Sequence, residues 1–110
     1  MLDGIYYNKM QFFRFYKDGT FLDCLIKGEG DMKLIATWFN KENTQSGIIK
    51  GHYKIVNNVI TFSTYSHFGY ERTIDYIGKA KGNKEIIFDS LNHNNGRKTQ
   101  NQKFIKFNLK

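Results

Sequence analysis

Hydrophobic and polar residues alternate along much of the chain in short runs, which residues typical of tight turns separate. The clearest two runs span residues 51–56 and 59–64, with Asn57-Asn58 between them. Asn tolerates left-handed backbone angles, so this dipeptide predicts a two-residue β-hairpin loop. The predicted register pairs Val56 with Val59, Ile55 with Ile60 and Tyr53 with Phe62. One face of the hairpin is then apolar and the other polar, as expected for a sheet with one buried side.

A second hairpin is predicted around Lys17-Asp18-Gly19, between residues 10–16 and 20–26. Two registers are open at this turn. A two-residue Asp-Gly loop places Arg14 opposite Asp23, whereas a three-residue loop with a left-handed Gly19 places Phe15 opposite Phe21. Aromatic residues fall on both faces of this hairpin, so another segment must cover part of its outer face.

Residues 31–39 are the predicted cover. Asp31 is a typical N-cap of a helix, and four apolar residues follow at helical spacing: Met32, Ile35, Ala36 and Phe39. A strand is the alternative, because Leu34, Ala36 and Trp38 also alternate. We expect a short helix, and we expect its Trp38 and Phe39 to close one end of the fold.

Further strands are predicted at residues 4–8, 70–80, 85–91 and 105–110, and the polar run 92–101 is typical of a surface loop. The total is about eight short antiparallel strands without a long crossover. Closing such a sheet on itself removes exposed strand edges, which invite aggregation. The sequence therefore predicts an all-β fold: one domain over residues 1–110, with a single antiparallel up-and-down barrel and one short helix.

The composition supports this fold class and raises the question of acidic partners. Ten Phe, seven Tyr and one Trp favour β-sheet. Seventeen Lys and Arg against ten Asp and Glu leave a formal net charge of +7. Such an excess attracts nucleic acid, acidic proteins or anionic membrane surfaces, although it also serves solubility.

Cys24 is the only cysteine, which excludes an intramolecular disulfide and favours a small buried apolar side chain. No apolar run reaches membrane-spanning length. If Met1 is the native start, the sequence predicts a cytoplasmic protein; a trimmed signal would instead place it in the envelope or outside the cell.

Catalytic and metal-binding patterns are weak. Neither Cys24 nor Ser63 lies in a motif that assigns it a general base. Asp75 and Asp89 fall on neighbouring predicted strands, where exposed cross-strand ion pairing is the favoured role. We therefore predict a non-enzymatic protein without cofactor or metal.

Several turn-and-aromatic motifs resemble small bacterial lipocalin-like barrels of the calycin group. They are Gly4-Ile5-Tyr6, Phe15-Tyr16-Lys17-Asp18-Gly19-Thr20, Trp38-Phe39-Asn40-Lys41-Glu42, Gly51-His52-Tyr53-Lys54-Ile55, Asn58-Val59-Ile60-Thr61-Phe62-Ser63 and Lys103-Phe104-Ile105. Two departures are the Gly-x-Tyr in place of the opening Gly-x-Trp and the absence of a disulfide. The resemblance implies an antiparallel barrel with an apolar interior, and it implies no particular ligand.

These observations predict a barrel whose interior binds a small apolar or amphipathic ligand. The predicted ligand-binding residues are Phe13, Phe15, Trp38, Tyr53, Ile55 and Phe62. The alternative for the same residues is a solid interior without a cavity.

Two further hypotheses concern macromolecular partners. A basic module for an acidic protein or single-stranded nucleic acid would stack bases on Tyr70 and Tyr76 beside Arg72, with Arg97 and Lys98 nearby. This ranks below the small ligand, because an aromatic stripe at period two is first of all core. Apolar residues on both faces of the hairpin at 10–26 predict a candidate homodimer interface.

Overall fold

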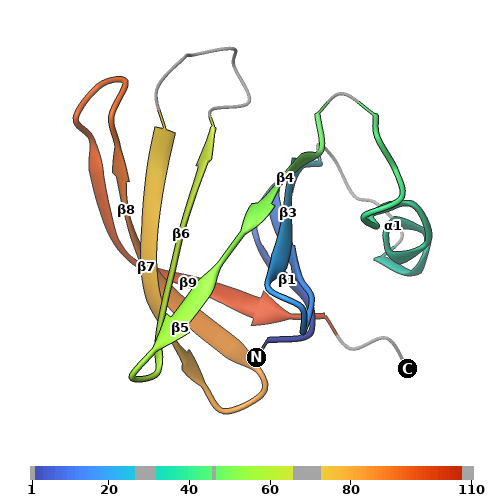
Figure 1. The fold of residues 1–110 in the computed structure, drawn as a ribbon, viewed down its shortest axis with the longest axis horizontal. Coiled ribbons are helices and arrows are strands. Elements are labelled where there is room, and N and C mark those ends of the chain that lie inside the picture. Colours follow the sequence, from blue (N-terminus) through green and yellow to red (C-terminus); the bar gives the residue numbers. More distant parts are fainter. Residues whose placement is uncertain (1, 27–31, 46, 66–72, 108–110) are drawn as a thin grey trace.

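The structure, a computed structural model, describes residues 2–26, 32–45, 47–65 and 73–107. Within these ranges the chain forms nine β-strands and one short helix, drawn in Figure 1. In chain order they are β1 (Gly4–Asn8), β2 (Gln11–Phe15), β3 (Thr20–Leu25), α1 (Met32–Trp38), β4 (Ile49–His52), β5 (Lys54–Val56), β6 (Val59–Tyr65), β7 (Thr73–Lys81), β8 (Glu85–Asn92) and β9 (Lys98–Lys106).

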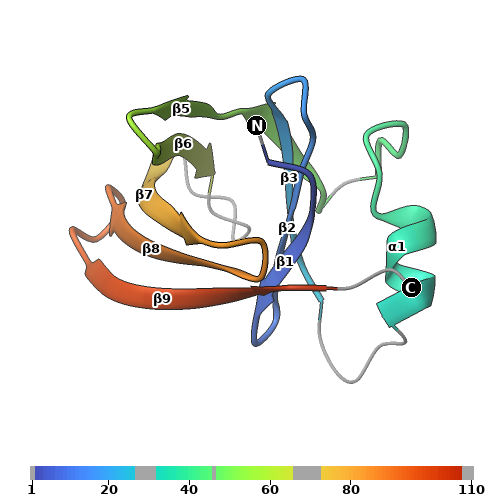
Figure 2. The same ribbon diagram turned by 90° about the horizontal axis from the view of Figure 1, so that it is seen from below.

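The strands form one antiparallel sheet in the order β4-β3-β2-β1-β9-β8-β7-β6-β5. Strand β1 pairs with β9, which brings the two ends of the chain together. The outermost strands of the order, β4 and β5, are joined through a single residue, so the sheet curls into a nearly closed barrel (Figures 1 and 2). The predicted all-β fold, an antiparallel up-and-down barrel with one short helix, is confirmed.

Tyr53 explains why there are nine strands and not eight. The predicted strand 51–56 divides at this residue: β4 pairs with β3, and β5 pairs with β6. The Tyr53 N–H donates to the Gly19 carbonyl at 2.9 Å, on the β3 side. The ladder between β5 and β6 therefore starts at Lys54 and Thr61, and the predicted pairing of Tyr53 with Phe62 is wrong.

Both predicted hairpin loops form. Asn57 and Asn58 have φ angles of 52° and 66°, and Val56 pairs with Val59 as expected of the two-residue loop. At the second turn Gly19 has a φ of 93° and Phe15 pairs with Phe21. The three-residue register is thus the one adopted there, and Arg14 lies opposite Leu22, not Asp23.

The C-terminal strand differs from its prediction. Strand β9 already begins at Lys98, so residues 98–101 belong to the sheet and not to a surface loop. The pairing of β9 with β8 shifts between Phe88 and Ser90, and Asn101 has a φ of 56° there. This irregularity, together with the polar composition of 98–102, hides the strand from a simple alternation pattern. Asp31, Tyr70–Arg72 and residues 108–110 lie outside the described residues.

Aromatic side chains fill the interior of the barrel. The Phe13 ring centroid lies 4.9 Å from that of Phe104, 5.2 Å from that of Tyr76 and 6.0 Å from that of Phe88. A side chain at Gly78, opposite Phe88, would collide with the Phe88 ring, so glycine is required at this position. The inner cluster consists of Tyr6, Phe13, Phe15, Phe21, Tyr53, Ile60, Phe62, Tyr76, Ile86, Phe88 and Phe104.

A second cluster lies on the outer face of β1–β3, beneath α1. Phe12, Leu22 and Cys24 point outward from the strands and are buried against Ile35 and Phe39. The helix therefore covers the outside of the sheet, as its amphipathic pattern requires. It does not close an end of the barrel, and that part of the prediction is wrong (Figure 2).

Arg14 fixes the C-terminal end of this helix. Its Nη1 donates to the carbonyl of Ala36 at 3.2 Å and to that of Phe39 at 2.6 Å. Its guanidinium also lies 5.2 Å from the Tyr16 ring centroid. A cation that binds the last carbonyls of a helix also interacts favourably with the helix dipole.

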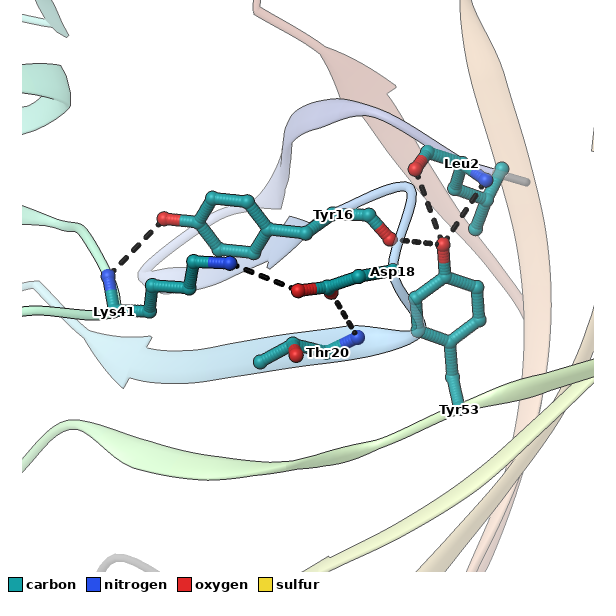
Figure 3. A network of polar contacts seen from close by, with 6 residues as sticks. All are labelled: Leu2, Tyr16, Asp18, Thr20, Lys41 and Tyr53. Atoms are coloured by element: carbon teal, nitrogen blue, oxygen red, sulfur yellow. Dashed lines mark hydrogen bonds and ion pairs between the residues drawn. The ribbon is translucent and has the colours of Figure 1, made fainter.

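A polar network ties the β2–β3 turn to Leu2, Lys41 and Tyr53, and so joins four segments of the chain (Figure 3). The Asp18 carboxylate accepts from the Lys41 ammonium at 2.8 Å and, secondly, from the Thr20 N–H at 2.9 Å, and these hydrogen bonds hold the pKa of Asp18 well below its usual range. The Lys41 N–H donates to the Tyr16 hydroxyl at 3.1 Å. The Tyr53 hydroxyl accepts from the Leu2 N–H at 3.0 Å and donates to the Tyr16 carbonyl.

Candidate functional site

The structure brings five of the six predicted ligand-binding residues together. Phe13, Phe15, Tyr53 and Phe62 are buried members of the inner cluster, and Ile55 packs against it. Trp38 is separate, because it packs with the outer cluster beneath α1. The sequence could place the first five on one inner wall by strand alternation, but alternation carries no information on which side the helix docks.

The inner residues pack against one another, and polar groups occupy part of the same space. The fully buried Asp23 carboxylate accepts from the Thr64 hydroxyl at 3.0 Å. The Gln11 amide donates to the Tyr76 hydroxyl at 3.0 Å, and burial raises the pKa of Tyr76 to about 12. These interactions keep buried polar groups satisfied and bind strands β2, β3, β6 and β7 across the interior.

A groove of about 570 Å³ lies outside the barrel. It crosses the outward-facing positions of the five neighbouring strands β5, β6, β7, β8 and β9, and His52 of β4 borders its β5 end. Two adjacent rows of side chains line it. The first row runs through Ser63, Asp75, Leu91 and Lys98, and the second through Lys54, Thr61, Ile77 and Asp89. His52 and Gln100 line the groove as well.

The centre of the groove has a diagonal arrangement of apolar and acidic side chains. Asp75 pairs with Leu91, and Ile77 pairs with Asp89. The two aliphatic side chains thus occupy one diagonal and the two carboxylates the other, and diagonal neighbours on a sheet are about 7–8 Å apart. Ile77 is 51% exposed, a high value for an isoleucine in the middle of a strand.

Asp75 is held by two neighbours. The Ser63 hydroxyl donates to Asp75 Oδ1 at 2.6 Å, and His93 Nε2 lies 2.7 Å from Asp75 Oδ2. The hydrogen bond from Ser63 and, secondly, that from His93 lower the pKa of Asp75. The sequence predicts a cross-strand ion pair for Asp75. Its partner in the structure is His93, which lies in the turn between β8 and β9.

Ser63, Asp75 and His93 do not form a catalytic triad. In a triad the histidine accepts the proton of the serine, and the carboxylate orients the histidine. Here the carboxylate lies between the other two groups, and Ser63 donates directly to it. Burial raises the pKa of the Cys24 thiol to about 11, which disfavours the thiolate that a nucleophilic cysteine requires.

Charges at the groove are arranged unevenly. Asp89 accepts a hydrogen bond from the Asn101 N–H at 2.9 Å. Lys54 lies at one end of the groove and Lys98 at the other, and neither takes part in an ion pair within the described part of the chain. The groove therefore offers an aliphatic centre, hydrogen-bonding carboxylates and cations at both ends.

Two predicted partner surfaces are corrected by the structure. Tyr76, expected on a base-stacking face, points into the core and is 6% exposed; Tyr70 and Arg72 lie outside the described residues. The hairpin at 10–26, expected to offer a dimer interface, has one face in the inner cluster and the other beneath α1. Both of its faces are occupied by the chain itself.

The sequence reasoning missed the groove residues. The sequence pattern at Ile77 could have predicted an exposed apolar residue. Ile77 directly follows Tyr76, so in a strand the two side chains point to opposite faces. With Tyr76 inside, an aliphatic side chain is left outside. The groove itself depends on the curvature of five strands, which alternation patterns do not specify.

Comparison of the chain with protein-family models, with curated proteins and with solved structures found no match. Among the described residues, no group of three or more His, Cys, Asp or Glu side chains is placed to bind a metal ion. Within those same residues, no helix is long and apolar enough to cross a membrane.

Proposed function

We propose that this protein is a non-enzymatic, lipocalin-like binding domain that takes a small amphipathic molecule in the groove on its outer face. The half-exposed Ile77 at the centre of that groove is the observation that carries the proposal. An aliphatic side chain in contact with water gains free energy when a ligand covers it. The surrounding carboxylates, hydroxyls and lysines supply the few polar contacts that orient a ligand.

The groove is favoured over the barrel interior as the binding site. Its volume of about 570 Å³ falls in the range of small-molecule sites. The interior residues, by contrast, already contact one another: Phe62, for example, lies 4.5 Å from Phe21 and 5.1 Å from Tyr76 between ring centroids. A ligand in the interior would have to displace these rings, which are packed as a protein core.

Binding of the fluorescent dye 1-anilinonaphthalene-8-sulfonate tests the proposal, followed by displacement of the dye with uncharged and charged alkyl compounds. Ile77→Asp and Leu91→Asp should each weaken dye binding about tenfold, since each removes roughly one buried aliphatic contact. The matched control is Ile105→Asp, because Ile105 is 46% exposed on β9 and lies outside the groove. We expect it to leave dye binding unchanged.

The same variants separate the groove from the interior. Saturable binding that survives both groove substitutions would place the ligand inside the barrel, among Phe13, Phe15 and Phe62. Absence of saturable binding to the unmodified protein, with the dye and with long-chain fatty acids, would overturn the binding proposal itself.

A further inference from the structure

A stripe of isoleucines begins at Ile77 in the groove and crosses the outer face of β7, β8 and β9 away from it. Ile87 on β8 pairs with Lys79, two residues along β7 from Ile77, so Ile77 and Ile87 are diagonal neighbours. Ile105 on β9 pairs with Glu85, two residues along β8 from Ile87, and continues the same diagonal. Diagonal neighbours on a sheet are about 7–8 Å apart, so the stripe is roughly 15 Å long. We call Ile77, Ile87 and Ile105 the aliphatic diagonal. A second depression, of about 410 Å³, lies along its first two residues.

Lysines border this diagonal. Lys79 and Lys103 lie directly opposite Ile87 on the two neighbouring strands, and Lys81 follows at the end of β7. Lys103 lies 3.8 Å from Glu85, whereas Lys79 and Lys81 take part in no ion pair within the described residues. Asp89 lies opposite Ile77 and Glu85 opposite Ile105, so the border carries both charges. Lys79 and Lys81 are its cations without an ion pair in the described part of the chain. An apolar stripe with two such cations along β7 is complementary to an apolar surface that carries anions on that side.

We propose that the aliphatic diagonal docks an acidic, amphipathic helical segment of a partner protein. A helix with apolar residues three and four positions apart presents a stripe of this kind, with acidic residues on the flank beside β7. The molecule itself provides the precedent, because Ile35 of α1 and Phe39, which directly follows the helix, cover the outward apolar positions of β1–β3. At 1.5 Å per residue, a helix of about ten residues matches the length of the diagonal.

Single-stranded nucleic acid fits this face less well. Sequence-tolerant binding of single strands uses exposed aromatic rings on which bases stack. The diagonal is aliphatic, and Tyr76 and Phe88 on the same strands point into the core.

Fluorescence anisotropy with a labelled synthetic peptide tests the proposal. The probe has about 18 residues, enough to form a helix, with Leu at helical spacing and Glu at the flanking positions. Two control probes are compared with it. One is the same peptide with Lys in place of Glu, and the other is a single-stranded DNA with the same net charge as the Glu peptide. We expect the Glu peptide to bind at least about tenfold more tightly than both, and to weaken as salt rises from 0.1 M to 1 M, where the Debye length falls from about 10 Å to about 3 Å.

Charge reversal locates the surface. Lys79→Glu combined with Lys81→Glu should weaken the peptide about tenfold, because two attractive contacts become repulsive. Lys17→Glu combined with Lys50→Glu makes the same change in net charge at exposed positions on the β2–β3 turn and on β4. We expect this control to change the affinity less than about threefold. Equal loss in both double variants, or equally tight binding of the Lys peptide or the DNA, would overturn the proposal.

The inference does not rest on the small-molecule proposal, and two variants separate the two. Ile105→Asp should weaken the peptide and spare the dye, since Ile105 belongs to the diagonal only. Leu91→Asp should weaken the dye and spare the peptide, since Leu91 belongs to the groove only. Circular dichroism confirms that each variant is folded. Peptide binding that Ile105→Asp leaves intact contradicts the docking surface, whatever the dye does.

Discussion

The outer face of β1–β3 and the outer face of β6–β9 belong to the same sheet but meet the solvent differently. On the first, Phe12 and Leu22 are 5% and 1% exposed beneath α1. On the second, Ile77 and Ile105 are 51% and 46% exposed, and no described element covers them. The outer face of β1–β3 therefore forms a second buried apolar cluster, whereas the outer face of β6–β9 stays exposed to solvent.

The sequence of the outward positions accounts for this difference. In β2 and β3 the outward side chains include Phe12, Leu22 and Cys24, so this face needs a cover that excludes water. In β6–β9 the outward isoleucines are interspersed with Thr61, Asp75, Lys79 and other polar residues, which keep the face soluble without a cover. The isoleucines of the aliphatic diagonal therefore stay accessible between polar neighbours.

The largest expected effect comes from deleting one side chain on each face. Phe39→Ala removes a fully buried ring beneath α1, so it should lower the free energy of unfolding by about 3–5 kcal/mol. Ile77→Ala on the uncovered face should change it by no more than about 0.5 kcal/mol. Urea unfolding of the two variants measures both values. Similar losses would contradict the distinction between a covered and an uncovered face.

Arg14 sharpens the comparison, because it is the polar residue that secures the cover. Arg14→Met keeps much of the side-chain volume but removes both hydrogen bonds to the carbonyls of Ala36 and Phe39. We expect a loss of about 2 kcal/mol in urea unfolding, as is typical for hydrogen bonds from a charged donor. Arg14→Lys retains the charge without the two-pronged donor and should fall between the parent and Arg14→Met. If Arg14→Lys lost as much unfolding free energy as Arg14→Met, the two-pronged hydrogen-bond geometry of the guanidinium would account for the whole effect, and the charge for none of it.

Much of the fold could be predicted because it depends on local signals. Asn57-Asn58 and Gly19 fix two hairpins through their left-handed backbone angles, and period-two alternation then assigns the inner wall. The helix followed from its spacing. Its docking side did not, because the same apolar stripe would fit an open end of the barrel as well as its outer face.

The features that escaped prediction depend on relations between distant segments. The division at Tyr53 arises because the barrel must close, so one strand serves β3 and β6 in turn. Residues 98–101 are polar and look like a loop, yet pairing with β8 makes them a strand. The groove needs five strands at their final curvature. A short local stretch of sequence does not specify any of these three features, because each depends on strand pairing between distant segments.

Tyr53 lies at the junction between β4 and β5, and removing its hydroxyl measures how much the hydrogen bonds at this junction stabilise the fold. Tyr53→Phe keeps the ring in the core but removes the contacts with the Leu2 N–H and the Tyr16 carbonyl. We expect a loss of about 1 kcal/mol in thermal or urea unfolding. Tyr65→Phe is the matched control, since Tyr65 is 56% exposed and should show no measurable change. Equal effects in the two variants would remove any special role for the junction.

The smallest expected effect belongs to Asp75 on the uncovered face, and it depends on pH. Because the pKa of Asp75 is lowered in the folded state, first by Ser63 and then by His93, the ionised carboxylate stabilises the fold above its unfolded pKa of about 3.9. This contribution is lost as the pH falls through the lower pKa of the folded state. The Asp75 side chain is 49% exposed, so solvent screening keeps the contribution below about 1 kcal/mol.

Unfolding of the parent protein and of Asp75→Asn between about pH 7 and pH 2 measures this contribution. The parent should be the more stable near neutral pH, and the difference should vanish in acid. Ser63→Ala removes the first cause of the lowered pKa, so the contribution should then be smaller and its loss complete at a higher pH. Thr61→Ala, an outward residue on the same strand without a contact to Asp75, should leave the pH profile unchanged. A difference that persists undiminished in acid would mean that Asp75 acts through packing and not through its charge.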